Sequence, residues 1–159
     1  MADVYRAPLD DMRFVLNEMV DLDQLTEIEA FNTATPDLVD HVLQTAAKFA
    51  EEVVGPLNQI GDQQGVRFEN GVVRMPDGFM DCYRKYVDAG WASVNGDPEY
   101  GGQGLPWTVG IALNEVWQSA NMSLANAWML TQAAVEAIQV HGTIPVSYTH
   151  LTLPTILLV

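Results

Sequence analysis

An eleven-residue stretch rich in glycine and proline, residues 96–106 (GDPEYGGQGLP), constrains the fold of this chain more than any other. Four glycines among its first nine residues allow the backbone to adopt positive φ angles or to approach another group closely. Regular helix or strand is excluded at this density of glycine and proline. Tyr100 and Leu105 supply apolar side chains that such a loop can bury. We therefore predict a loop between two helical halves, and its simplest interpretation is a rigid turn that binds nothing.

Apolar residues recur at helical spacing on both sides of this loop. The clearest helix begins at Thr35 and Pro36, which suit the cap and the first helical position, and ends at Gly55 and Pro56. The last predicted helix is apolar almost all round, so we expect it to be buried on several sides, one of them by a further part of a larger protein. The spacing predicts helices over 10–20, 25–30, 36–54, 79–89, 107–119 and 123–140, with 10–20 burying Met12, Val15, Leu16 and Met19, and 79–89 burying Phe79, Tyr83, Tyr86 and Val87.

Between the second and third long helices, residues 61–74 read as a polar connection that contains one turn signal. Asn70-Gly71 stands between β-prone residues in the segment 66–73 (VRFENGVV). Asn-Gly favours the tight two-residue turn of a β-hairpin. The sequence therefore predicts an all-α fold with one small, peripheral hairpin.

The bulk composition narrows the possible partners. The length of 159 residues suits one domain, and 21 acidic against 7 basic residues give a net charge of −14. Phosphate binding needs a basic patch, so this balance disfavours nucleic acid and anionic membranes. The single cysteine, Cys82, cannot form an internal disulfide, and neither a signal peptide nor a membrane-spanning run is visible. We therefore expect a cytoplasmic protein without a membrane span.

No catalytic or metal-binding constellation stands out in the sequence. His41 has no second ligand at metal spacing on its helix face, so we expect no metal site. Glu51 and Glu52 are adjacent on a helix and point in different directions, which favours a solvated face over an acid/base pair. Glu115 and Glu136 lie on the two apolar helices, where each is either a partly buried carboxylate with a raised pKa or an acid at the helix edge.

Several motifs together resemble one family. They are residues 98–105 (PEYGGQGL), residues 49–58 (FAEEVVGPLN), the pair Gly90-Trp91 before the loop and the pair Asn114-Glu115 after it. The set resembles the N-terminal helical domain of acyl-CoA dehydrogenases. Residues 5–12 (YRAPLDDM) resemble the longer N-terminus of the 3-methylmercaptopropionyl-CoA dehydrogenase-like branch of that family. The resemblance covers residues 1 to about 144. Any one of these motifs would be a weak signal, but together they are specific.

The resemblance implies a reaction and its partners. Members of the family remove a proton from Cα and a hydride from Cβ of an acyl-CoA thioester, giving a 2,3-enoyl-CoA. FAD takes the hydride and passes electrons to electron-transfer flavoprotein, and the enzymes assemble as homo-oligomers. In the family the base is a glutamate of the C-terminal helical domain, and most FAD contacts come from a middle β-domain. We therefore assign no catalytic and no cofactor-binding residue here, and expect this chain alone to be inactive.

The resemblance also implies a wall of the substrate site. The N-terminal helices of the family help to enclose the acyl chain, and the matching segment here is the first half of the helix predicted over 123–140. The candidate substrate-binding residues are Asn126, Trp128, Met129 and Gln132. A tryptophan at this place would shorten the pocket, which is consistent with a small or branched acyl group. The alternative for each of the four residues is ordinary core packing.

The end of the chain differs in character from the rest. Residues 146–155 (VSYTHLTLPT) contain no acid or base and closely resemble one reading frame of a transposase adapter used in preparing sequencing libraries. We therefore divide the chain into an N-terminal extension with short helices (1–35), a helical domain (36–144) and a non-native, adapter-derived tail (145–159). The alternative for the tail is a genuine short β-segment.

Two other functions remain open from the sequence. An acyl-CoA oxidase or a flavin monooxygenase relative would share the same fold. A non-enzymatic acidic helical interaction module would use the apolar face of the last predicted helix as its partner surface. If the chain is such a module, residues 1–144 should form a soluble unit that folds cooperatively. If it is a truncated enzyme, the product should aggregate through an exposed apolar patch.

Overall fold

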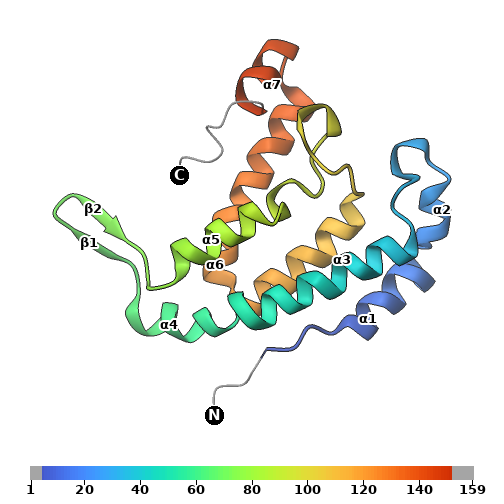
Figure 1. Ribbon diagram of the computed structural model, residues 1–159. Coiled ribbons are helices and arrows are strands. Elements are labelled where there is room, and N and C mark those ends of the chain that lie inside the picture. The colour runs from blue at the N-terminus through green and yellow to red at the C-terminus, as the bar shows by residue number, and fades with distance from the viewer. Residues whose placement is uncertain (1–4, 152–159) are drawn as a thin grey trace.

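The computed structural model of the protein describes residues 5–151 and shows helices packed around one core, with a two-stranded β-hairpin extending from them (Figure 1). The predicted all-α class with a small hairpin is confirmed. The elements in order are α1 (Leu9–Phe14), η1 (Val15–Met19), α2 (Leu22–Thr26), η2 (Glu29–Phe31), α3 (Pro36–Phe49), η3 (Ala50–Val54), α4 (Pro56–Gln64), β1 (Arg67–Glu69), β2 (Val72–Arg74), α5 (Phe79–Asp88), η4 (Trp91–Ser93), η5 (Pro98–Tyr100), α6 (Trp107–His141) and α7 (Ile144–Leu151).

The N-terminal helix packs on α3 through both apolar and polar contacts. Met12 and Leu16 are buried as predicted, but the predicted burial of Val15 and Met19 is wrong, because these side chains are 43% and 71% exposed. A π-helical turn over Val15–Met19 changes the residue spacing, so the predicted stripe does not stay on one face. The extension and α3 therefore share one core, although fewer side chains of the extension reach it than the pattern predicts.

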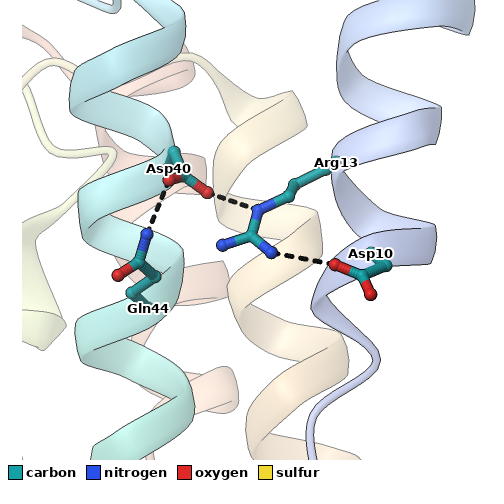
Figure 2. A network of polar contacts seen from close by, with 4 residues as sticks. All are labelled: Asp10, Arg13, Asp40 and Gln44. Carbon is teal, nitrogen blue, oxygen red and sulfur yellow. Dashed lines mark hydrogen bonds and ion pairs between the residues drawn. The ribbon is translucent and has the colours of Figure 1, made fainter.

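Arg13 links α1 to α3 in a small polar network (Figure 2). Its Nε donates to Asp40 Oδ1 at 2.6 Å, its Nη1 donates to Asp10 Oδ1 at 3.0 Å, and Gln44 Nε2 donates to Asp40 Oδ2 at 2.6 Å. The guanidinium of Arg13 lowers the pKa of Asp40 below its usual value. Arg13 and Asp40 are partly exposed and Asp10 is fully exposed, so solvent screens both ion pairs. The pairs therefore orient α1 more than they stabilise it.

The long helix predicted over 36–54 begins and ends as expected, as α3 followed by η3, and the helix α4 that follows it was not predicted. Thr35 Oγ1 accepts from the N–H of Leu38 at 3.3 Å, which is the predicted cap. The predicted end at Gly55 and Pro56 is confirmed, since η3 ends at Val54 and a separate helix, α4, starts at Pro56. A proline at the first helical position loses no hydrogen bond and has the required φ, so it can begin a new helix where an older one ends.

The predicted hairpin is present over β1 and β2, which pair antiparallel with Phe68 opposite Val73. Asn70 and Gly71 have φ angles of 52° and 78°, the positive values that a tight two-residue turn requires. Every residue of both strands is exposed, and the hairpin extends away from the helices (Figure 1).

The aromatic centre of the core lies between α3, α5 and α6. Trp117 contacts three rings edge-on, those of Phe49, Tyr86 and Trp91, with centroid distances of 5.8, 5.9 and 5.3 Å. The predicted buried face of α5 is confirmed at Phe79 and Tyr86, while Tyr83 and Val87 are only half-buried, and Cys82 is buried beside them. The core thus depends on contacts between rings that lie far apart in the sequence.

The two helices predicted after the glycine-rich loop form α6, which is broken at Asn121. This residue is extended (φ −164°, ψ 91°), and its Oδ1 accepts from the N–H of Leu124 at 3.2 Å and the hydroxyl of Ser123 at 2.9 Å. Asn121 therefore caps a second helical segment, residues 122–141, as the predicted break between 119 and 123 requires.

Within the described chain, the second segment of α6 is buried on one side, and the expected cover of another side by a further part of a larger protein stays a prediction. Leu124, Ala125 and Trp128 are buried, but Leu130 is 65% exposed. We name its exposed side the open face; it consists of Asn126, Ala127, Leu130, Ala133, Ala134 and Ala137.

The segment 144–151 forms helix α7, so the alternative of a β-segment is wrong for these residues. Ser147 Oγ donates to the carbonyl of Ile138 at 3.4 Å, which holds α7 against the end of α6. The remainder of the predicted tail, 152–159, lies outside the described residues. No helix within 5–151 combines the length and apolar content needed to cross a lipid bilayer.

Candidate functional site

The glycine-rich loop folds as a rigid unit held by its own backbone. Four successive N–H groups, those of residues 102–105, donate to carbonyls at or just before the loop. The pairs are Gly102 with Asp97 (2.9 Å), Gln103 with Ser93 (2.9 Å), Gly104 with Gly96 (3.0 Å) and Leu105 with Val94 (3.0 Å). The predicted rigid turn between helices is therefore confirmed, and these N–H groups already have partners.

Two glycines of the loop are required for separate reasons. Gly101 has a φ of 87°, which side-chain-bearing residues rarely adopt. A Cβ at Gly102 would overlap the carbonyl carbon and oxygen of Gly96, so the backbone crosses itself where only glycine fits. The density of glycine in the loop thus reflects two positive φ angles, at Gly101 and Gly104, and one close backbone approach, at Gly102.

Asn95 joins the loop to α6, and the sequence analysis did not single it out. Its Nδ2 donates to the carbonyls of Leu105 at 2.9 Å and Pro106 at 3.0 Å. A Cβ at Gly110 would overlap the Asn95 amide, so the first turns of α6 pack directly on this side chain. A small residue three positions after Trp107 is the only sequence signal that could have indicated the contact.

A cavity of about 140 Å³ lies between the loop and the second segment of α6. The loop contributes Tyr100 to its wall and Asn95 precedes the loop there, while α6 contributes Trp128 and Gln132 and α7 contributes Leu151. Two of the four predicted site residues, Trp128 and Gln132, are therefore brought together here.

Trp128 is held within the core beneath that cavity. Only 2% of it is exposed, and its indole stacks on Tyr86, whose hydroxyl donates to the carbonyl of Trp91 at 3.2 Å. Gln132 Nε2 donates to the same hydroxyl at 3.4 Å. Burial raises the pKa of Tyr86 well above its usual value, so the phenol stays neutral. Within the described chain, Trp128 Nε1 and Gln132 Oε1 have no hydrogen-bond partner.

The other two predicted site residues lie elsewhere on the same helix. Asn126 is exposed on the open face. Met129 is half-buried at its edge, where its sulfur accepts from Gln118 Nε2 at 3.3 Å. The four candidates thus occupy two sides of α6: Trp128 and Gln132 point toward the core, whereas Asn126 and Met129 border the open face.

The structure shows the surroundings of the glutamates that the sequence analysis considered as possible acids or bases. Glu51 pairs with Arg6 and accepts from the backbone N–H of Ala7 at 3.1 Å, which fastens the N-terminal segment to η3. Burial, together with Glu115 and Glu51 nearby, raises the pKa of Tyr5 to about 12. Glu136 lines the cavity. Within residues 5–151, no three His, Cys, Asp or Glu side chains lie together as metal ligands would.

Residues 38–146 match the family model described as "Acyl-CoA dehydrogenase, N-terminal domain". This region includes the glycine-rich loop, both sides of α6 and the cavity lining except Leu151. The chain belongs to the acyl-CoA dehydrogenase family. The family resemblance expected from residues 98–105 and 49–58 is thereby confirmed.

Two relatives in the acyl-CoA dehydrogenase family extend the comparison. The chain is 34% identical over 139 residues to a 3-methylmercaptopropionyl-CoA dehydrogenase of Ruegeria pomeroyi, covering 87% of this chain and 24% of that protein. It is 26% identical over 139 residues to a butyryl-CoA dehydrogenase of Syntrophomonas wolfei, covering 85% of this chain and 23% of that protein. The chain thus spans about a quarter of the length of these curated relatives.

Proposed function

We propose that this chain is the N-terminal helical part of an FAD-dependent acyl-CoA dehydrogenase that converts an acyl-CoA to its 2,3-enoyl-CoA. The match of residues 38–146 to the family's N-terminal domain carries the proposal. Electron-transfer flavoprotein would accept the electrons, and the whole enzyme would be a homo-oligomer in the cytoplasm. The one cysteine, which is buried and unpaired, is compatible with a reducing compartment.

Within this proposal, the open face of α6 forms one wall of the acyl pocket. Asn126 and Met129 border that face and would contact the acyl chain directly. Trp128 is fully buried against Tyr86, so it would not contact the acyl chain. It would instead fix the position of α6 and thereby of the pocket wall. Gln132 would hold the Tyr86 hydroxyl and thereby the same stack. A wall that is held from behind by two stacked rings cannot yield easily, which favours a small or branched acyl group.

The described residues do not fit FAD by themselves. A dinucleotide pyrophosphate is usually held by free backbone N–H groups at a glycine-rich turn before a helix. Here the N–H groups of residues 102–105 donate to carbonyls of the chain itself. We therefore propose that the chain alone is inactive and binds FAD weakly or not at all. Titration of the chain with FAD, followed by flavin fluorescence, tests this, and tight stoichiometric quenching would contradict it.

A chimera tests the proposed function directly. Residues 1–144 of this chain would replace the matching region of the Ruegeria pomeroyi relative, and acyl-CoA-dependent reduction of an artificial electron acceptor would be measured. We expect the chimera to retain FAD and to oxidise a short acyl-CoA. A chimera that folds and retains FAD, yet oxidises none of a series of acyl-CoA thioesters, would count against the proposal.

The wall itself is tested within the same chimera. Met129→Ala would enlarge the pocket, and we expect the preferred acyl chain to become longer, with the KM for longer thioesters falling. Met80→Ala, the same change at an exposed position of α5 outside the open face, is the matched control. Equal effects of the two substitutions would show that Met129 has no particular place in the pocket.

A further inference from the structure

A hydrogen bond joins the two segments of α6 across the break at Asn121. Gln118 Nε2 donates to the sulfur of Met129 at 3.3 Å. On a straight α-helix these two residues would lie about 16 Å apart along the axis, because eleven residues separate them. Asn121 is extended, and the two segments run in different directions (Figure 1). The break is therefore what allows the two side chains to meet.

The bond fixes a side chain that is otherwise adaptable. Methionine is unbranched with three rotatable bonds, and its sulfur is only a weak acceptor. Met129 is half-buried at the edge of the open face, so its side chain can change position unless it is held. The amide of Gln118 binds the sulfur itself and so holds the far end of the side chain. Gln118 therefore decides which of several positions the Met129 side chain takes.

Gln118 lies on the first segment of α6, outside the open face. It is half-buried there and lines a groove together with Ile111, Asn114 and Met122. The open face belongs to the second segment, and Gln118 reaches its edge through the bond to Met129. Any effect of Gln118 on the proposed acyl pocket consequently passes through another side chain.

We propose that Gln118 is a positioning residue that sets the acyl-chain preference of the pocket through the sulfur of Met129. The proposal rests on the proposed function, in which Met129 contacts the acyl chain. With the bond in place, the thioether is a fixed part of the pocket wall. Without it, the side chain can turn aside for a longer acyl chain. Discrimination between short and long thioesters, which is the ratio of their kcat/KM values, then falls.

The contact is tested first in the chain itself, without a substrate or FAD. Gln118→Leu keeps the approximate size of the side chain and removes the donor, and Asn114→Leu makes the same kind of exchange one helical turn earlier. Oxidation of Met129 by dilute hydrogen peroxide is followed by peptide mass spectrometry. We expect Gln118→Leu to raise its rate at least about threefold, which the loss of one weak hydrogen bond allows. Asn114→Leu should leave it within about twofold.

Met12 provides an internal reference in the same samples. It is buried, so its oxidation reports any general loosening of the fold and should stay slow in all three proteins. Equal oxidation of Met129 in Gln118→Leu and Asn114→Leu overturns the proposal. A parallel rise at Met12 and Met129 also overturns it, because the effect of Gln118 would then be on overall stability.

The effect on specificity is measured in the chimera, with butyryl-CoA as the short and octanoyl-CoA as the long thioester. Gln118→Leu should lower the ratio of their kcat/KM values at least about threefold, and Asn114→Leu should leave it within about twofold. Met129→Leu has no sulfur to bind, so adding Gln118→Leu to it should change nothing further. An equal fall in the ratio in both backgrounds overturns the positioning role.

The results separate this proposal from the one on which it rests. If the chimera oxidises thioesters and Gln118→Leu leaves the ratio unchanged, the positioning role fails and the proposed function stands. If the chimera folds and retains FAD but oxidises no thioester, the proposed function fails and the positioning role fails with it, whatever the oxidation of Met129 shows.

Discussion

The ring of Tyr86 in α5 stacks on the indole of Trp128 in α6, with centroids 4.2 Å apart and planes 9° from parallel. The stack lies directly beneath the cavity between the glycine-rich loop and α6. Because Tyr86 also contacts Trp117 edge-on, the candidate site and the aromatic centre of the core are one packed unit. Changes at the site should therefore alter the stability of the whole fold.

Trp128→Ala is expected to lower the free energy of unfolding by about 3–5 kcal/mol, because it leaves a cavity where the indole stacks on Tyr86. Trp107→Ala removes the same side chain from a position that is 41% exposed, so we expect less than half that loss. Urea unfolding followed by far-ultraviolet circular dichroism measures both. Similar losses for the two variants would contradict the central place given to Trp128.

Gly102→Ala is expected to destabilise the protein by at least about 3 kcal/mol, the upper end of overpacking effects. Its Cβ would overlap the Gly96 backbone, which cannot move without breaking the hydrogen bonds of the loop. Gly101→Ala is the control: nothing lies near its Cβ, so only the φ of 87° opposes it, at about 1 kcal/mol. Thermal unfolding of the two variants measures the difference in stability. A larger destabilisation by Gly101→Ala than by Gly102→Ala would refute the close approach of the backbone at residues 96 and 102.

Asn121→Ala is expected to lower the free energy of unfolding by about 1 kcal/mol, because the second segment of α6 loses its cap. The effect is limited because Asn121 Nδ2 is buried without a partner in the described chain, and removing it relieves that penalty. Asn126→Ala is the matched control, since this asparagine is exposed within the helix, and we expect a change near zero. Chemical denaturation at equilibrium measures the difference between the two, and a larger loss from Asn126→Ala would rule out the cap.

The stability of the protein is expected to fall as the pH rises from about 9 to about 11. Burial raises the pKa of the Cys82 thiol from 9.0 to about 11, so between these values the unfolded chain releases a proton that the folded chain keeps. The folded state binds more protons in this window, and stability therefore decreases with rising pH, by on the order of 2 kcal/mol for this group.

Cys82→Ala checks the origin of this alkaline loss. The variant removes the titrating thiol, so its urea midpoint should fall less between pH 9 and pH 11 than that of the unchanged chain. Tyr5, whose pKa is raised to about 12, adds its effect only at the upper end of the window, where both proteins should lose stability together. Parallel curves from pH 9 onward would exclude Cys82 as the cause.

Local signals in the sequence were enough for several elements. Thr35 and Pro36 start α3 because a cap oxygen and a fixed φ act within a few residues. Asn70 and Gly71 form the hairpin turn because both tolerate positive φ. The break in α6 near Asn121 was likewise predicted, since an extended residue with a capping side chain needs no distant partner.

The candidate site was predicted less completely, and the reason is geometric. A resemblance over 123–140 named four residues on one helix, but their orientation depends on how α6 rotates against α5 and the glycine-rich loop. Tertiary packing buries Trp128 and turns Asn126 outward, a difference that the resemblance did not indicate. Asn95 was missed because its partners, the carbonyls of Leu105 and Pro106, are ten and eleven residues away and carry no side-chain signal.

By itself, the sequence determined the helical class, the hairpin turn, the glycine-rich loop and the family, because caps, turn preferences and short motifs are properties of neighbouring residues. Only the tertiary structure decided that Pro56 begins a helix, that Val15 and Met19 face solvent, and that α6 keeps an open face. Those outcomes depend on which surfaces meet after the chain has folded. Burial depends on which two elements pack against each other, and the order of residues along the chain does not specify that pairing.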